Sequence, residues 1–445
     1  MKKNAWIIAL IALSLGVWFD IIFFKANYVG LNIFLAEIAF LGAAIGLAYY
    51  TKQQTPIRSW VAAGFALAYS ATFVFWTSEL GLTLSAFGFL MANILFVIFM
   101  IGYQAHFKHP IDLIKISTLN LARHLLGRAH VLCELKPAKL SNRGTSIAIG
   151  VGISIPILIV FIALFANADA VVDGILKDFS DWLKTFTDVS NSIRHAIMIG
   201  FFTFGFLLFF AAAFWQRFEI KALQERVPKG KIESAIVLGS VNLLFTTFLI
   251  IQAVYLFGGQ AAFDAIEGIT YSEYVRQGFT QLTVVAVLVV LLSLTLRWIH
   301  SERTKGIIVA LHLSLIVETV LIMISAFIRL QLYIDAYNYT PTRLFGMWML
   351  IVIAVLFGMM FVNIVRNSGQ EKLIRNGLLV IGTAALFFTM STPDATAVKL
   401  NIARATADNP LDPFPLFDDL SAEAVPIMLH VFESGEVPIS GILDE

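Results

Sequence analysis

Residues 345–365 read FGMWMLIVIAVLFGMMFVNIV, an unbroken hydrophobic stretch without a charged side chain. A helix needs roughly 17–25 mostly apolar residues to cross the hydrocarbon core of a bilayer. This stretch therefore predicts a transmembrane helix, and with it an integral membrane protein.

The composition of the whole chain agrees with this prediction. Of the 445 residues, 58% are hydrophobic and only 14% are charged, whereas a soluble domain carries about a quarter charged residues. The net charge of +1 gives no indication of a nucleic-acid partner. The partner that the composition does predict is the lipid bilayer.

Ten further stretches have the length and composition of membrane spans, which predicts an all-α bundle of about eleven transmembrane helices. The stretch nearest the N-terminus, 5–24, reaches full spanning length, so it is expected to be an uncleaved span rather than a signal peptide. The eleven expected spans are 5–24, 29–50, 57–76, 80–103, 146–166, 194–215, 232–257, 278–299, 307–328, 345–365 and 376–391.

Lysine and arginine residues are unevenly distributed between the two sides of the membrane that the expected spans define. With the N-terminus placed inside, 22 of the 31 Lys and Arg residues fall on the inner side, and every inner segment takes part in this bias. Cytoplasmic connections of membrane proteins carry such an excess. The sequence therefore predicts a multi-pass protein of the bacterial cytoplasmic membrane, with its N-terminus inside and its C-terminal tail outside.

The hydrophilic segments divide the chain into four parts. The expected division is a four-span segment (1–103), a basic amphipathic cytoplasmic loop (104–145), a seven-span segment (146–391) and an acidic extracytoplasmic tail (392–445). The basic loop is expected either to lie on anionic lipid or to pack on the bundle as a linker helix.

Two expected outer segments concentrate tyrosine and arginine: YSEYVRQGF (271–279) and RLQLYIDAYNYTPTRL (329–344). They flank two spans joined by a short inner loop, so they can meet in space. The candidate site residues are Tyr271, Tyr274, Arg276, Arg329, Tyr333, Asp335, Tyr337 and Arg343.

Two interpretations of this Tyr/Arg cluster stay open. Guanidinium groups and phenol hydroxyls suit a carboxylate or a phosphate, which predicts an anionic ligand or a lipid headgroup. Alternatively, the tyrosines form an interfacial belt and the arginines pair with acids such as Asp335, Asp418 and Asp419, so that the cluster clamps the tail.

Three ionisable residues inside the expected spans form a second candidate set: Glu37, His312 and Glu318. Because lipid makes such groups costly, they mark candidate functional positions. One hypothesis is a proton-coupled path through the two glutamates. The other is a pair of protonated carboxyls hydrogen-bonded between helices to Asn93, Asn242 or Gln252.

No catalytic, nucleotide-binding or metal-binding motif occurs in the sequence. His124, His130 and Cys133 lack the spacing of a four-ligand metal site. We therefore expect a protein that is not an enzyme and that has neither a cofactor nor a metal.

The two outer segments, together with the tail strings PDATAVKLNIAR and LSAEAVPIML, resemble a family of bacterial multi-pass membrane proteins of unknown function, of the DUF 4153/4173 type. The resemblance covers about residues 260–445. It implies one shared outer site but no reaction. Where the family usually has Gly and Leu, this chain has Asn338 and Tyr339, and Asn tolerates the left-handed conformation. The matching residues are Tyr271, Tyr274, Arg276, Gly278, Phe279, Arg329, Tyr333, Tyr337, Thr340, Arg343, Asn401 and Arg404.

The leading functional hypothesis is a non-enzymatic membrane protein whose Tyr/Arg cluster binds an anionic ligand or its own tail. The first alternative is a secondary transporter that uses Glu37 and Glu318. The second is a sensor or scaffold whose tail and basic loop bind a protein partner. The third is a membrane enzyme for lipid-linked substrates, for which His195 is the histidine nearest the outer edge of a span.

Overall fold

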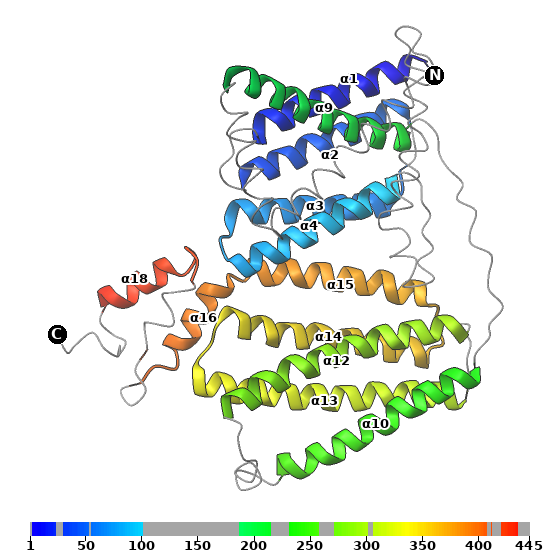
Figure 1. The fold of residues 1–445 in the computed structure, drawn as a ribbon, viewed down its shortest axis with the longest axis vertical. Helices are drawn as coiled ribbons and strands as arrows, with labels where there is room; N and C mark the ends of the chain where they lie inside the picture. Colours follow the sequence, from blue (N-terminus) through cyan, green and yellow to red (C-terminus); the bar gives the residue numbers. More distant parts are fainter. Residues whose placement is uncertain are drawn as a thin grey trace, which may run out of the picture. The chain divides into compact units, whose positions relative to one another are not determined.

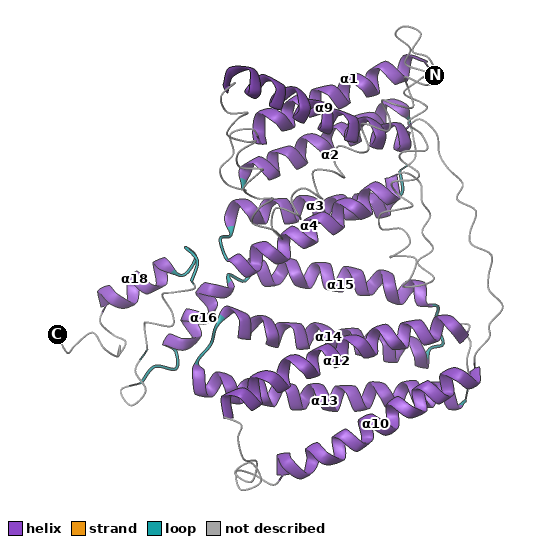
Figure 2. Ribbon diagram, viewed as in Figure 1, coloured by secondary structure: helices purple, strands orange, loops and turns teal. Residues whose placement is uncertain are grey.

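The computed structural model describes residues 2–23, 30–52, 55–100, 187–214, 231–257, 271–300, 306–406, 411 and 420–434. The regular elements in these ranges are helices, and the described part of the chain contains no strand (Figures 1 and 2). The helices are α1 (Lys2–Phe23), α2 (Leu31–Thr51), α3 (Ile57–Phe75), α4 (Glu79–Met100), α9 (Thr187–Phe214), α10 (Lys231–Phe257), α12 (Tyr271–His300), α13 (Ile307–Tyr337), α14 (Pro341–Val365), α15 (Gln370–Met390), α16 (Pro393–Ile402) and α18 (Val425–Ser434).

The helices bear out the all-α prediction and most of the predicted span positions. Seven of them, α1 to α4 and α13 to α15, are long and apolar enough to cross a membrane. The described apolar parts of α9, α10 and α12 are shorter, at Arg194–Phe210, Ser234–Ile250 and Leu282–Arg297. The expected span at 146–166 and the basic loop at 104–145 lie outside the described residues.

Four predicted boundaries are wrong. The helices α9 and α12 begin at Thr187 and Tyr271, each seven residues before the expected span starts at 194 and 278. The ninth span was expected to end at 328, but α13 continues to Tyr337, so most of the segment 329–344 is helical. The helix α14 then begins almost at once, because Thr340 accepts a hydrogen bond from the backbone N–H of Arg343 at 3.3 Å and Pro341 occupies the first turn. The helix α15 begins at Gln370, several residues before the expected start of the eleventh span at 376, because polar residues extend its first turns.

The described helices belong to two compact units. The first unit contains α1, α2 and α9, with the start of α3 and the end of α4. Its core is aromatic: the ring of Phe40 lies 5.7 Å from that of Phe96 and 5.4 Å from that of Phe209. Interlocking aromatic rings of this kind fill a helix interface without any polar partner.

The second unit contains α10, α12 to α16 and α18, with the end of α3 and the start of α4. The helix α13 packs against α10, α12 and α14, and α14 packs against α15 (Figure 1). Its buried side chains include Leu315, Ile322 and Phe357, whereas Val317 and Ile351 are 51% and 60% exposed. Helices with apolar residues on the outer face as well as in the core are typical of a bundle surrounded by lipid.

Candidate functional site

The connection between α13 and α14 is short and polar, and we call residues 337–340 the α13–α14 turn. Asn338 in this turn has φ 63° and ψ 176°. The positive φ agrees with the expectation for the position where the family usually has glycine. The ψ value is extended rather than left-handed helical, a combination that is strained for a residue with a side chain.

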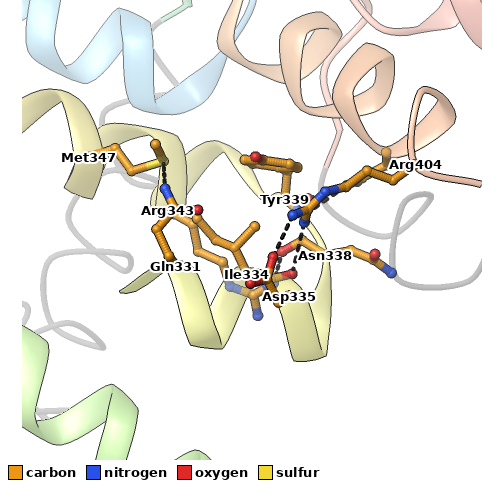
Figure 3. A network of polar contacts seen from close by, with 9 residues as sticks. Gln331, Ile334, Asp335, Asn338, Tyr339, Arg343, Met347 and Arg404 are labelled. Atoms are coloured by element: carbon orange, nitrogen blue, oxygen red, sulfur yellow. Dashed lines mark hydrogen bonds and ion pairs between the residues drawn. The ribbon is translucent and has the colours of Figure 1, made fainter. Parts of the chain in front are cut away.

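Arg343 closes the turn from the other side (Figure 3). Its guanidinium donates hydrogen bonds to the backbone carbonyls of Tyr337 and Asn338, which are among the carbonyls left without intrahelical partners at the end of α13. The guanidinium carbon also lies 4.3 Å from the ring centre of Tyr333, a cation–π distance. The guanidinium of Arg343 therefore interacts with groups of the turn and of the end of α13.

The first helix of the C-terminal segment, α16, docks on this turn through Asn401. The backbone N–H of Tyr339 donates to Oδ1 of Asn401 at 2.7 Å, and Nδ2 of Asn401 donates to the backbone carbonyl of Tyr339 at 2.9 Å. Asn401 is only 2% exposed. One side-chain amide thus satisfies both backbone groups of Tyr339 in a site that excludes most solvent.

Arg404 makes a second link between the same segments. Its guanidinium forms an ion pair with Asp335, donates to the carbonyl of Ile334 at 3.4 Å and lies 4.8 Å from the ring centre of Tyr339 (Figure 3). The side chains of Arg404 and Asp335 are 36% and 55% exposed. An ion pair this open to solvent is worth roughly 1 kcal/mol or less, so Asn401 is the stronger of the two links.

The C-terminal segment also reaches the turn between α3 and α4. Oε1 of Glu423 accepts hydrogen bonds from the backbone N–H groups of Thr77 at 2.8 Å and Ser78 at 3.2 Å. A carboxylate at the N-terminus of a helix, here α4, is favoured by the helix dipole. Asp394, which is 4% exposed, accepts from the hydroxyl of Ser78 at 3.4 Å and from the backbone N–H of Ser421 at 3.2 Å.

The structure therefore brings together part of the predicted cluster. Tyr333, Asp335, Tyr337 and Arg343 lie at the α13–α14 turn, and Arg329 lies half-buried about two helical turns earlier on α13. The other predicted members, Tyr271, Tyr274 and Arg276, lie on α12, and their side chains are outside the described residues.

The observed ion pair between the cluster and the tail has its acid and its base on the opposite segments from those expected. Cluster arginines were expected to pair with tail acids such as Asp418 and Asp419, which lie outside the described residues. In the described ion pair the cluster supplies the acid, Asp335, and the tail supplies the arginine, Arg404. The tail residues Asp394 and Glu423 were not predicted, because acids are frequent in this tail and nothing in their local sequence distinguishes them.

Residues 7–431 match a family described as "Domain of unknown function (DUF4153)". The chain belongs to this family. No curated protein and no solved structure matches it. The match extends well beyond residues 260–445, to which the sequence resemblance was limited, so the N-terminal helices are part of the family's shared architecture. The DUF4153 chain is thus a multi-pass membrane protein of a family without an assigned activity.

The intramembrane carboxyls of this DUF4153 chain lie in different units. Glu37, in the first unit, is 4% exposed and hydrogen-bonds with the side chain of Asn93, one of the partners named above. Glu318, in the second unit, accepts from the hydroxyls of Thr246 at 2.9 Å and Ser314 at 3.3 Å. Neither hydroxyl was among the expected partners.

The remaining expected partners of the carboxyls lie elsewhere. Asn242 donates to the backbone carbonyls of Leu238 and Leu311, and the side chain of Gln252 lies outside the described residues. His312 is buried, at 2% exposed. The sequence signal that could have identified Thr246 and Ser314 was weak, because hydroxyl residues are common in membrane helices.

A pair between a buried acid and a partly exposed histidine joins α1 to α9 in the first unit. Oδ2 of Asp20 lies 2.5 Å from Nδ1 of His195, and Asp20 is 4% exposed. The sequence pointed to His195 as the histidine nearest the outer edge of a span, but its pairing with Asp20 could not be predicted across such a long separation. Within the described ranges, no three His, Cys, Asp or Glu side chains lie close enough together to hold a metal ion.

Proposed function

We propose that this DUF4153 protein spans the bacterial cytoplasmic membrane about eleven times, with its N-terminus in the cytoplasm and its C-terminal segment outside. The sorting of Lys and Arg residues along the sequence supports this orientation. The seven long apolar helices and the three shorter ones support most of the span positions.

Reporter fusions test the orientation. Alkaline phosphatase, which is active only outside the cytoplasm, is expected to be active when fused after Glu445 and inactive when fused after Ser368, between α14 and α15. A green fluorescent protein, which folds in the cytoplasm, should give the reverse pattern at the same two sites. Fluorescence of the Glu445 fusion would place the C-terminus in the cytoplasm. With the N-terminus also inside, this result would contradict an odd number of spans.

The proposed function of the Tyr/Arg cluster is to hold the protein's own C-terminal segment, from Thr392 onward, on the outer end of the bundle. The observation that carries this proposal is the reciprocal pair of hydrogen bonds between Asn401 and Tyr339, made by a side chain that is almost fully buried. The ion pair of Arg404 with Asp335 supports it from a second position. A clamp of this kind needs no catalytic residue.

The arrangement favours the clamp over a site for an anionic ligand. An anion would need a guanidinium with free donors in a partly desolvated setting. Arg343 directs its donors to the carbonyls of Tyr337 and Asn338, and Arg404 directs its donors to Asp335 and Ile334. An incoming carboxylate or phosphate would compete with these acceptors for Nη1 of Arg343 and for both terminal nitrogens of Arg404.

A clamped segment gives the protein a docked and a released state. Release would expose the buried faces of α16 and of the α13–α14 turn, including Asn401 and Tyr339. A sensor or scaffold whose C-terminal segment binds a protein partner only after release would follow from this two-state behaviour. The clamp is thus compatible with the sensor alternative, and it does not require transport.

Protease added to spheroplasts tests the clamp. We expect Arg404→Ala to speed cleavage within residues 392–434 by about 2- to 5-fold, in keeping with the roughly 1 kcal/mol or less of an exposed ion pair. Lys399→Ala is the matched control, since Lys399 is exposed on the same helix. The exchange of charges in the double variant Asp335→Arg with Arg404→Asp should restore slow cleavage.

The clamp would be contradicted if Arg404→Ala and the Lys399→Ala control were cleaved at the same rate. It would also be contradicted if phosphate or a soluble dicarboxylate slowed the cleavage of the wild-type protein, because an anion competing for the arginines should release the segment. Only faster cleavage in Arg404→Ala than in the control agrees with the proposal.

A further inference from the structure

Glu318 lies far from both ends of the helix that carries it. It is on α13 (Ile307–Tyr337), about 17 Å along the helix axis from its first residue. The stripe around it is apolar and exposed, with Val317 51%, Leu321 48% and Ile324 51% exposed. A carboxyl group at this depth, on the edge of a lipid-type surface, needs its charge neutralised.

Two hydroxyls converge on the carboxyl from two helices. Oε1 of Glu318 accepts from Oγ1 of Thr246, on α10, at 2.9 Å and from Oγ of Ser314, one turn earlier on α13, at 3.3 Å. Oε2 is buried and has no hydrogen-bond partner among the described residues. The result is a carboxylate and two hydroxyl oxygens around one point, with one carboxyl oxygen left for a further ligand.

Among the residues that the structure describes, no lysine, arginine or histidine forms an ion pair with this carboxylate. Of the described helices, α10, α12 and α14 pack on α13, and their central sequences are apolar. The stretch Ser234–Ile250 of α10 has no ionisable residue, Leu282–Arg297 of α12 has only Arg297 at its end, and α14 has only Arg343 at its start. On α13 itself the nearest ionisable residue is His312, six residues away and on another face of the helix.

We propose that Glu318, Thr246 and Ser314 form an exchangeable site for one monovalent cation, a proton or a sodium ion. A proton would reside on Oε2 while Oε1 keeps both hydroxyl hydrogen bonds. A sodium ion would be held by the carboxylate together with the two hydroxyl oxygens, which are hard donors suited to it. One positive charge balances the one carboxylate, whereas a divalent ion would leave a net charge in lipid.

This site is independent of the clamp on the C-terminal segment. Neither Glu318 nor its two partners contacts the α13–α14 turn, so loss of one function need not affect the other. The site would supply the cation-binding step that the transporter alternative requires, without by itself establishing transport.

Labelling with a hydrophobic carbodiimide tests the proposal. Dicyclohexylcarbodiimide enters lipid and adds covalently to protonated carboxyl groups, and mass spectrometry of the peptide that contains Glu318 measures the extent. In membranes holding the full chain, we expect Glu318 to be labelled and the labelling to fall as the proton concentration is lowered. If the bound cation is sodium, sodium chloride should protect Glu318 at constant pH, whereas choline chloride at the same concentration should not.

Variants separate the site from its surroundings. Glu318→Gln should abolish the label on this peptide. Thr246→Val removes one hydroxyl without changing the shape of the side chain. It should shift the proton or sodium concentration at which labelling is half-maximal by about 10-fold, as expected for a hydrogen bond to a charged group. Thr247→Val is the matched control, because Thr247 bonds only to the carbonyl of Leu243 on its own helix.

Three results would overturn the proposal. The first is no label on Glu318 at any pH, while a water-soluble carbodiimide does label it, which would place the carboxyl in water. The second is a label that depends on neither pH nor sodium, which would mean a permanently fixed proton. The third is an equal effect of Thr246→Val and Thr247→Val.

Discussion

Replacing Asn401 by alanine is expected to detach α16 from the α13–α14 turn. The substitution leaves both the N–H and the carbonyl of Tyr339 without the partners that they have in the structure. Because Asn401 is 2% exposed, water does not easily replace it, and two unsatisfied groups cost about 2–4 kcal/mol in total. Of the residues in the clamp, this one should therefore have the largest effect.

Hydrogen exchange measured by mass spectrometry, on protein in detergent, checks this result. Amides of α16 and of the turn should exchange about 30- to 1,000-fold faster in Asn401→Ala, the factor that corresponds to the loss above. Asn401→Asp keeps an acceptor for the N–H of Tyr339 but places a carboxylate oxygen against its carbonyl in a buried site, so it should exchange at least as fast as Asn401→Ala. Unchanged protection of α16 in the alanine variant would refute the assigned role of Asn401.

Gly16→Ala is expected to separate α1 from α9. A Cβ atom at Gly16 would lie 2.1 Å from Oγ1 of Thr203 and 2.9 Å from the backbone carbonyl oxygen of Ile199. The side chain of Thr203 can rotate away, but a backbone carbonyl can only move together with its helix. Overpacking of this kind costs about 1–3 kcal/mol or more, and it should also disturb the pair of Asp20 and His195 one turn further along.

Thermal unfolding in detergent, followed by circular dichroism, measures the effect. The melting temperature of Gly16→Ala should fall by a few degrees, because 1 kcal/mol corresponds to roughly 2–4 °C in a domain of 150–250 residues and to less in a longer chain. Gly42→Ala is the matched control, because a Cβ atom there meets nothing within 4 Å. Equal melting temperatures for the two variants would show that the close approach at Gly16 does not limit the packing of α1 on α9.

The sequence is informative about those properties that each segment carries by itself. A run such as 345–365 is long and apolar enough to predict a span without reference to any other part of the chain, and α14 lies there. The positive φ of Asn338 followed from the resemblance to a family that usually has glycine at this position. The ends of α13 and α15 were missed, because a helix can continue past the apolar stretch that identifies it.

The candidate site was accessible from sequence only in part. The tyrosines and arginines of 329–344 could be grouped, because helical spacing and a short connection bring them together. Their use could not be decided, since an arginine beside tyrosines serves an anionic ligand and an internal acid equally well. In the structure Arg343 bonds carbonyls of its own turn, and Asp335 meets Arg404 from the tail.

The amino-acid sequence by itself thus determined that this is a helical membrane protein, where most of its helices lie and which residues are candidates for function. Only the tertiary structure decided the partners: Asn401 with Tyr339, Asp20 with His195, and Glu318 with Thr246. The physical reason is that transfer into lipid depends on the length and composition of one segment. A hydrogen bond depends instead on two atoms lying about 3 Å apart, and residues distant in the sequence reach that distance only after the helices have packed.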